Sequence, residues 1–163
     1  MMIELREITP ENHIDARSLK VHSSQEKFVA TVDKSLADAY VWKGAQARVA
    51  LDDGVAVGFV MIFPYNSGGL RVVNVVRLLV DSRFQQKGIG RRLLEATLDW
   101  INSLSPRVNR IRISTLPENA VALNLYKSSG FSGDEIEDGE VVLYRRVTDD
   151  IEKPALNAHS QSV

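Results

Sequence analysis

The chain has 163 residues, of which 44% are hydrophobic, so it is long enough to bury the core of one domain. Its 20 Lys and Arg residues nearly balance 21 Asp and Glu residues, and the net charge of −1 excludes the overall basic field of a nucleic-acid-binding protein. Cysteine is absent, which excludes disulfides, thiolate metal sites and cysteine nucleophiles and fits the reducing cytoplasm.

The sequence also lacks the segments that direct a protein to a membrane. The N-terminal stretch MMIELREITPEN mixes acidic with apolar residues and has no signal-peptide core. A run of 18 consecutive apolar residues occurs nowhere in the chain. We therefore expect a soluble, cytoplasmic protein with neither a nucleic-acid nor a membrane partner.

The first predicted elements are one strand and two helical segments. Residues 3–8 alternate as a short strand. Thr9 as N-cap and Pro10 at the first helical position then predict a helix over 10–19. Residues 23–42 carry apolar side chains at helical spacing, and this pattern predicts one or two short helices.

Extended segments dominate the middle of the chain. Two apolar runs flank Asp53 and Gly54, whose turn chemistry predicts a hairpin over residues 47–65. Residues 71–80 are almost continuously apolar, which is typical of a strand buried on both faces. Residues 90–104 place leucines and isoleucine on one helical face and charges on the other, so this helix is expected to pack on the sheet.

The last third of the chain repeats this alternation. Residues 110–115 alternate as a strand, and Asn119 can cap a helix that runs to about residue 129. Two closing strands are expected over residues 131–136 and 140–147, separated by a turn. The tail from residue 148 has no periodicity and is expected to be flexible. The predicted architecture is a mixed sheet flanked by helices.

The stretch QQKGIGRR, residues 85–92, lies between the predicted strand and the long helix. A helix N-terminus exposes N–H groups without partners at the positive end of the macrodipole, so it binds anions. Gly88 and Gly90 would let phosphate oxygens approach the backbone, and the neighbouring basic residues would add charge: Lys87, Arg91 and Arg92. The alternative is a tight turn with solvated basic side chains. A Walker loop is absent, and Leu93 stands where a dinucleotide fingerprint needs its third glycine.

Two motifs resemble the GNAT acetyltransferase superfamily. QQKGIG is similar to its Gln/Arg-x-x-Gly-x-Gly/Ala signature, and ENAVALNLYKSSGF is similar to its Asn-containing helix that ends in Tyr-x-x-x-Gly-Phe. The resemblance implies an α/β (α+β) fold with a mixed, mostly antiparallel sheet of six to seven strands. It further implies a splayed strand pair, about four flanking helices, a single domain over residues 1–147 and a flexible tail over 148–163.

The resemblance also implies a role for particular residues. Acetyl-CoA is the expected co-substrate, with Tyr126 as the acid that protonates the leaving thiol. Main-chain groups of Leu78, Leu79 and Val80 are expected to pair with pantetheine. The glycine turn and the second motif supply the other expected cofactor contacts: Gln85, Gln86, Lys87, Gly88, Ile89, Gly90, Arg91 and Asn119.

A proton acceptor for the amine is harder to assign. An alkyl ammonium with a pKa near 10.4 must lose a proton before it attacks, at a cost of about 4 to 5 kcal/mol at pH 7. Many family members carry a glutamate on the strand before the signature, but RVVNVVRLLV has no carboxylate. Asp81 could relay the proton through water or could simply cap a turn. Glu26 is a second candidate, and bulk water a third.

The acceptor itself is suggested by QEKFVATVDKSLADAY, which resembles the early helices of spermine/spermidine and diamine acetyltransferases. A polycationic amine needs carboxylates and aromatic faces. This stretch offers Glu26, Asp33, Asp38 and Tyr40. The expected substrate-binding residues are Glu26, Asp33, Tyr40 and Asp81, although acids on a helix can equally form a solvated face. VVNVV replaces the bulky aromatic that precedes RLLVD in these relatives, so the amine itself stays open.

Two other functions stay open: acetylation of protein or peptide amines, and a non-catalytic CoA-binding regulatory module. Tyr126 disfavours the second, because a mere binder needs no proton donor at the sulfur. Helices within residues 23–42 that cover the groove would favour a small acceptor over a peptide. His13, His22 and His159 lack metal-ligand spacing, so no metal is expected. The sequence is compatible with a homodimer.

Overall fold

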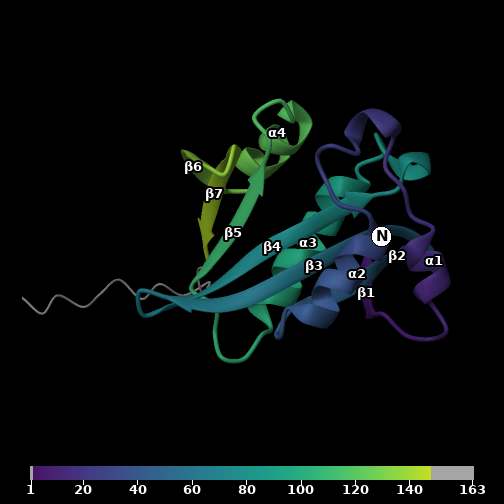
Figure 1. Ribbon diagram of the computed structural model, residues 1–163, viewed down its shortest axis with the longest axis horizontal. Helices are drawn as coiled ribbons and strands as arrows, with labels where there is room; N and C mark the ends of the chain where they lie inside the picture. The colour runs from purple at the N-terminus through teal and green to yellow at the C-terminus, as the bar shows by residue number, and fades with distance from the viewer. Residues whose placement is uncertain (1, 148–163) are drawn as a thin grey trace, which may run out of the picture.

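The computed structural model describes residues 2–147, which form one sheet with helices on both faces (Figure 1). Within these residues the strands are β1 (Glu4–Glu7), β2 (Gln46–Asp52), β3 (Val55–Ser67), β4 (Leu70–Val80), β5 (Arg110–Thr115), β6 (Ser132–Glu137) and β7 (Glu140–Arg146). The helices are α1 (His13–Arg17), α2 (Val32–Val41), α3 (Ile89–Asn102) and α4 (Ala120–Ser128), with 3-10 turns η1 (Ser23–Gln25) and η2 (Ser82–Phe84). The predicted tail lies outside the described residues.

The seven strands are ordered β1-β2-β3-β4-β5-β7-β6, and only the β4–β5 pair is parallel. That pair is short, because residues 72–75 of β4 lie opposite residues 110–113 of β5 and the strands then diverge. Figure 1 shows β5 rising to α4 while β4 continues away from it. The mixed, mostly antiparallel sheet with a splayed pair is therefore confirmed.

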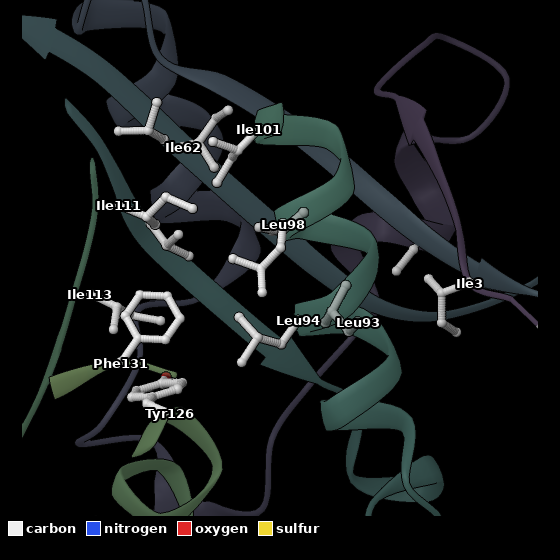
Figure 2. Close-up of a cluster of buried hydrophobic side chains, with 14 of the residues drawn as sticks. Ile3, Ile62, Leu93, Leu94, Leu98, Ile101, Ile111, Ile113, Tyr126 and Phe131 are labelled. Atoms are coloured by element: carbon white, nitrogen blue, oxygen red, sulfur yellow. The ribbon is translucent and has the colours of Figure 1, made fainter. Parts of the chain in front are cut away.

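One face of the sheet is covered by α3 and α4. Leu93, Leu94, Leu98 and Ile101 are buried at helical spacing along α3, so a single stripe of the helix faces the core. These side chains belong to one cluster with residues of the central strands and with aromatic rings of the α4 region (Figure 2). Burying each such side chain stabilises the fold by about 1.5 to 3 kcal/mol.

The other face is covered by α1 and α2. Ala16, Leu19 and Val32 pack in a second cluster against Phe59 and Met61 of β3. Helix α2 starts where the Thr31 side chain accepts a hydrogen bond from the Lys34 N–H at 3.1 Å. The Ser82 N–H, just after β4, donates to the Lys20 carbonyl at 2.8 Å and so connects this layer to the end of β4.

The helix expected over 10–19 is shorter than predicted. The side-chain oxygen of Asn12 accepts from the Thr9 N–H at 2.8 Å, and its amide donates to the Glu7 carbonyl, also at 2.8 Å. These bonds hold residues 9–12 in a turn, so α1 begins at His13 with Asn12 as N-cap. Thr9 is therefore not the N-cap, and the later boundaries fall within about two residues of those predicted.

Candidate functional site

The divergence of β4 and β5 beyond residue 75, hereafter the fork, leaves one edge of β4 without a strand partner. The Asp81 N–H donates to the Val57 carbonyl of β3 at 2.9 Å. Since main-chain groups alternate sides along a strand, Leu79 also faces β3, whereas Leu78 and Val80 turn their N–H and C=O groups toward the fork. Of the three residues expected to pair with pantetheine, Leu78 and Val80 have the required orientation and Leu79 does not.

The glycine turn closes one end of the fork. Gly88 has φ +76° and is the N-cap of α3, a backbone conformation that disfavours side chains. The N–H groups of Ile89, Gly90 and Arg91 open the helix and have no acceptor within it. Apart from its own neighbours in the chain, no heavy atom of the described residues lies within 4 Å of the position that a Cβ on Gly88 would occupy. The turn thus presents main-chain donors to open space, as a diphosphate requires.

The basic residues of this turn differ in their partners. Lys87 is exposed, and Arg91 donates to the Ser128 hydroxyl of α4 at 2.8 Å. Arg92, expected to add charge at the phosphate site, instead donates to both carboxylate oxygens of Asp52 at 3.0 and 3.2 Å. The hydrogen bond from Arg92 lowers the pKa of Asp52. Arg92 therefore binds the β2–β3 hairpin, because it lies farther along α3 than the turn.

Gln85 joins the glycine turn to η1. Its amide donates to the Gln25 side-chain oxygen at 2.8 Å and accepts from the Gln25 amide at 3.0 Å. The same Gln85 nitrogen donates to the Val80 carbonyl at 3.0 Å. Both groups of the Gln85 side chain are thus engaged within the protein. We infer that Gln85 holds the turn against the segment before α2, a contact that no motif in the sequence indicated.

Asp81 makes a second link between the same segments. It is 2% exposed, and its carboxylate accepts from the Lys20 N–H at 2.9 Å and from Arg83 at 2.8 and 3.0 Å. Burial works to raise the pKa of Asp81, but these hydrogen bonds outweigh it and leave the pKa below its ordinary value. Asp81 is therefore an ionised cap of η2, as the alternative interpretation had it, and its oxygens are already occupied.

Tyr126 lies on α4 at the edge of the main core. It is 6% exposed, and its ring lies against Phe131 with centroids 6.2 Å apart (Figure 2). Its hydroxyl has no hydrogen-bond partner among residues 2–147. Burial first, and the negative charge of Glu140 second, raise the pKa of Tyr126 to about 12. The hydroxyl therefore keeps its proton across the neutral range and is free to donate it.

Asn119 positions the helix that carries Tyr126. Its side-chain oxygen accepts from the Ala122 N–H at 3.3 Å, and its amide donates to the Thr115 hydroxyl at 3.0 Å. The predicted N-cap is confirmed. Because both groups are engaged, Asn119 contributes to the site through the placement of α4 at the end of β5.

The residues expected to bind the acceptor differ in exposure and in their partners. Tyr40 is 91% exposed at the end of α2, and Glu26 is exposed just after η1. Asp33 pairs with Arg17 at 2.8 Å, and Asp81 is engaged as described. Binding of the acceptor by Glu26, Asp33, Tyr40 and Asp81 stays a prediction.

Two further carboxylates lie near the fork: Asp38, one of the acids that the early helices offered in the sequence, and Glu140, which the sequence interpretation passed over. Asp38 is half-buried and pairs with Arg77 at 3.0 Å and with Lys34 at 2.9 Å. Glu140 accepts from the Ser114 hydroxyl at 3.2 Å. The signal that could have found Glu140 is the alternation of β7, which begins beside the end of β5.

Two further observations concern metals and membranes. Among residues 2–147, no three or more His, Asp or Glu side chains gather closely enough to hold a metal ion. In the same described range, no helix is long and apolar enough to cross a bilayer.

Comparisons with known proteins agree with this geometry. The Acetyltransferase (GNAT) family matches residues 12–131. A spermine/spermidine N(1)-acetyltransferase of Bacillus subtilis (strain 168) is 28% identical over 155 residues, which is 90% of this chain and 100% of that protein. The L-amino acid N-acetyltransferase AaaT of Escherichia coli (strain K12) is 26% identical over 123 residues, 69% of this chain and 73% of that protein.

The fold has solved counterparts as well. A GNAT family acetyltransferase from Elizabethkingia anophelis, crystallised with acetyl-CoA bound, has a TM-score of 0.65 at 17% identity, over 89% of this chain and 98% of that chain. A match over most of the chain's length shows the family. The chain therefore belongs to the GNAT acetyltransferase family and is an acetyl-CoA-dependent N-acetyltransferase.

Proposed function

We propose that the protein transfers the acetyl group of acetyl-CoA to a primary amine of a small polycationic acceptor such as spermidine, spermine or a diamine, by direct attack in a ternary complex. The observation that carries the proposal is the fork, with the glycine turn at one end and Tyr126 beside it. Both substrates can meet in such an opening without a covalent enzyme intermediate. Cysteine is absent from the chain, so no thiol nucleophile competes with this route.

The chain's own groups fit the acetyl donor. The N–H groups of residues 88–91 would hold the diphosphate, with charge added by Lys87. The outward main-chain groups of Leu78 and the outward N–H of Val80 would pair with the amides of pantetheine, since the Val80 carbonyl already accepts from Gln85. When bound, acetyl-CoA supplies an activated acetyl group, which forms an amide with the amine nitrogen while CoA leaves as a thiol. Positioning of the two reactants at the fork can account for much of the acceleration.

Tyr126 is proposed as the proton donor to the departing sulfur. With a pKa raised to about 12, it is protonated throughout the pH range in which the enzyme would work. A thiol resembling cysteine has a pKa near 8.5, so full transfer from such a tyrosine is uphill. Donation therefore takes place as the sulfur develops charge, and a hydrogen bond from the hydroxyl contributes before the proton moves.

A polycationic acceptor is favoured over an amino acid by the extent of the similarity. The similarity to the Bacillus subtilis spermine/spermidine enzyme spans that whole protein, whereas the similarity to the Escherichia coli amino acid enzyme spans 73% of it.

The test is a panel of amines with release of CoA thiol as the readout. Spermidine, spermine and putrescine would be compared with amino acids and with peptides, each at several concentrations, and reactions without amine would give the background. We expect kcat/KM to be highest for the polyamines. Turnover confined to amino acids or peptides would contradict the acceptor, and no turnover with any amine would contradict the proposed function.

A further inference from the structure

The inner corner of the fork carries a serine and a glutamate that touch. Ile113 is the last residue of β5 opposite β4, and Ser114 follows it. Ile113 and Thr115 are buried toward α3 and α4, so strand alternation turns Ser114 to the opposite face, the one on which α2 lies. There its hydroxyl donates to Oε2 of Glu140 at 3.2 Å.

Glu140 is poorly compensated for a half-buried carboxylate. No cation among residues 2–147 lies within ion-pairing distance of it, and Ser114 is its hydrogen-bond partner there. Two other acids of the described residues differ from Glu140, because Glu137 pairs with Arg112 at 3.2 Å and Asp38 pairs with Arg77 at 3.0 Å. A carboxylate held in place and left without a cation favours an incoming ammonium group.

We propose that Glu140 receives the acceptor's ammonium group and accepts its proton, with Ser114 fixing the orientation of the carboxylate. This inference rests on the proposed function. In the step, one N–H bond of the ammonium breaks and an O–H bond forms on Glu140, which leaves a neutral amine with its lone pair. The carboxylic acid later returns its proton to water. No carboxylate of β4 competes for this role, and Asp81 is occupied by its hydrogen bonds.

The same residue couples the two proton transfers. The negative charge of Glu140 contributes to the raised pKa of Tyr126, although burial contributes more. When Glu140 takes up the proton of the ammonium, this charge disappears and Tyr126 becomes a stronger acid. Deprotonation of the amine therefore prepares the donor for the leaving thiol.

The variant Glu140→Gln tests the inference, because its amide keeps the shape and can still accept from Ser114. We expect kcat/KM for the best amine of the panel to fall about 100-fold or more at pH 7. The deficit should shrink as the pH rises toward the amine's pKa near 10.4, because the solution then supplies the neutral amine. Acetyl-CoA affinity measured by calorimetry should be unchanged. The matched control is Glu135→Gln on the same hairpin, an exposed acid whose loss should leave the kinetics unaltered.

A second readout needs neither substrate. NMR titration of the Tyr126 Cζ resonance should show a lower pKa in Glu140→Gln than in the wild-type protein. Unchanged kcat/KM, a deficit that is the same at every pH, or an unshifted Tyr126 titration would each overturn the role of Glu140. A wild-type protein inactive toward every amine would instead overturn the proposed function, and the inference with it.

Discussion

Replacing Tyr126 with phenylalanine should remove a pH-dependent part of the protein's stability. The folded-state pKa is about 12 against an ordinary value of 10.0. Above pH 10 the hydroxyl ionises in the unfolded chain but not in the folded one, so the free energy of unfolding decreases as the pH rises through this window. The full difference corresponds to about 3 kcal/mol, and about 1 kcal/mol of it should be lost by pH 11.

The assay is urea unfolding of the wild-type protein and Tyr126→Phe at pH 8, 10 and 11. Both proteins contain every other titrating group, including Tyr65, whose pKa burial also raises. Only the difference between the two stability curves therefore reports on Tyr126. We expect the wild-type protein to lose about 1 kcal/mol more than the variant between pH 8 and 11. Parallel curves would refute the argument that the hydroxyl is desolvated in the folded state.

Three further predictions concern the site. Tyr126→Phe should lower kcat by one to three orders of magnitude, about 1.4 to 4 kcal/mol, with little change in acetyl-CoA affinity, and an unchanged kcat would remove it from the acid role. Gly88→Val places a side chain at φ +76° in front of the helix N-terminus, so acetyl-CoA binding measured by calorimetry should weaken more than about tenfold. Circular dichroism should show that the variant is folded. Normal binding would place the diphosphate elsewhere. Asp81→Asn should cost about 1 to 3 kcal/mol at pH 7 by thermal or urea unfolding. Because the Asp81 pKa is lowered, the wild-type advantage should be present above the ordinary pKa of 3.8 and disappear as the pH falls below it, and an advantage that persists in acid would contradict the cap role.

Features set by local chemistry were predictable from the sequence. The strand over residues 110–115 and the N-cap at Asn119 follow from alternation and capping preference, and both are confirmed. The glycine turn at residues 85–90 stands out because a helix that begins with glycine exposes donors whatever the rest of the chain does. The splayed strand pair was predicted from the resemblance to the GNAT family, because hydrophobic periodicity does not indicate how strands diverge.

Features set by distant contacts were not predictable. The role of Asp81 depends on the Lys20 N–H, 61 residues away, and the direction of Arg92 depends on Asp52, 40 residues away. From the sequence alone, Glu140 is only a residue of the closing hairpin. Its contact with Ser114 depends on the pairing of β5 with β7. The acids of the early helices were predicted to bind the amine because of their charge. Which of them are exposed and which are paired depends on tertiary packing.

The most direct test of the account is a crystal structure of the protein with CoA. We expect the diphosphate oxygens within hydrogen-bond distance of the N–H groups of residues 88–91, and the pantetheine amides paired with Leu78 and Val80 in the fork. The Tyr126 hydroxyl should then be the protein donor nearest the sulfur. Phosphates bound away from the start of α3, or pantetheine outside the fork, would contradict the account.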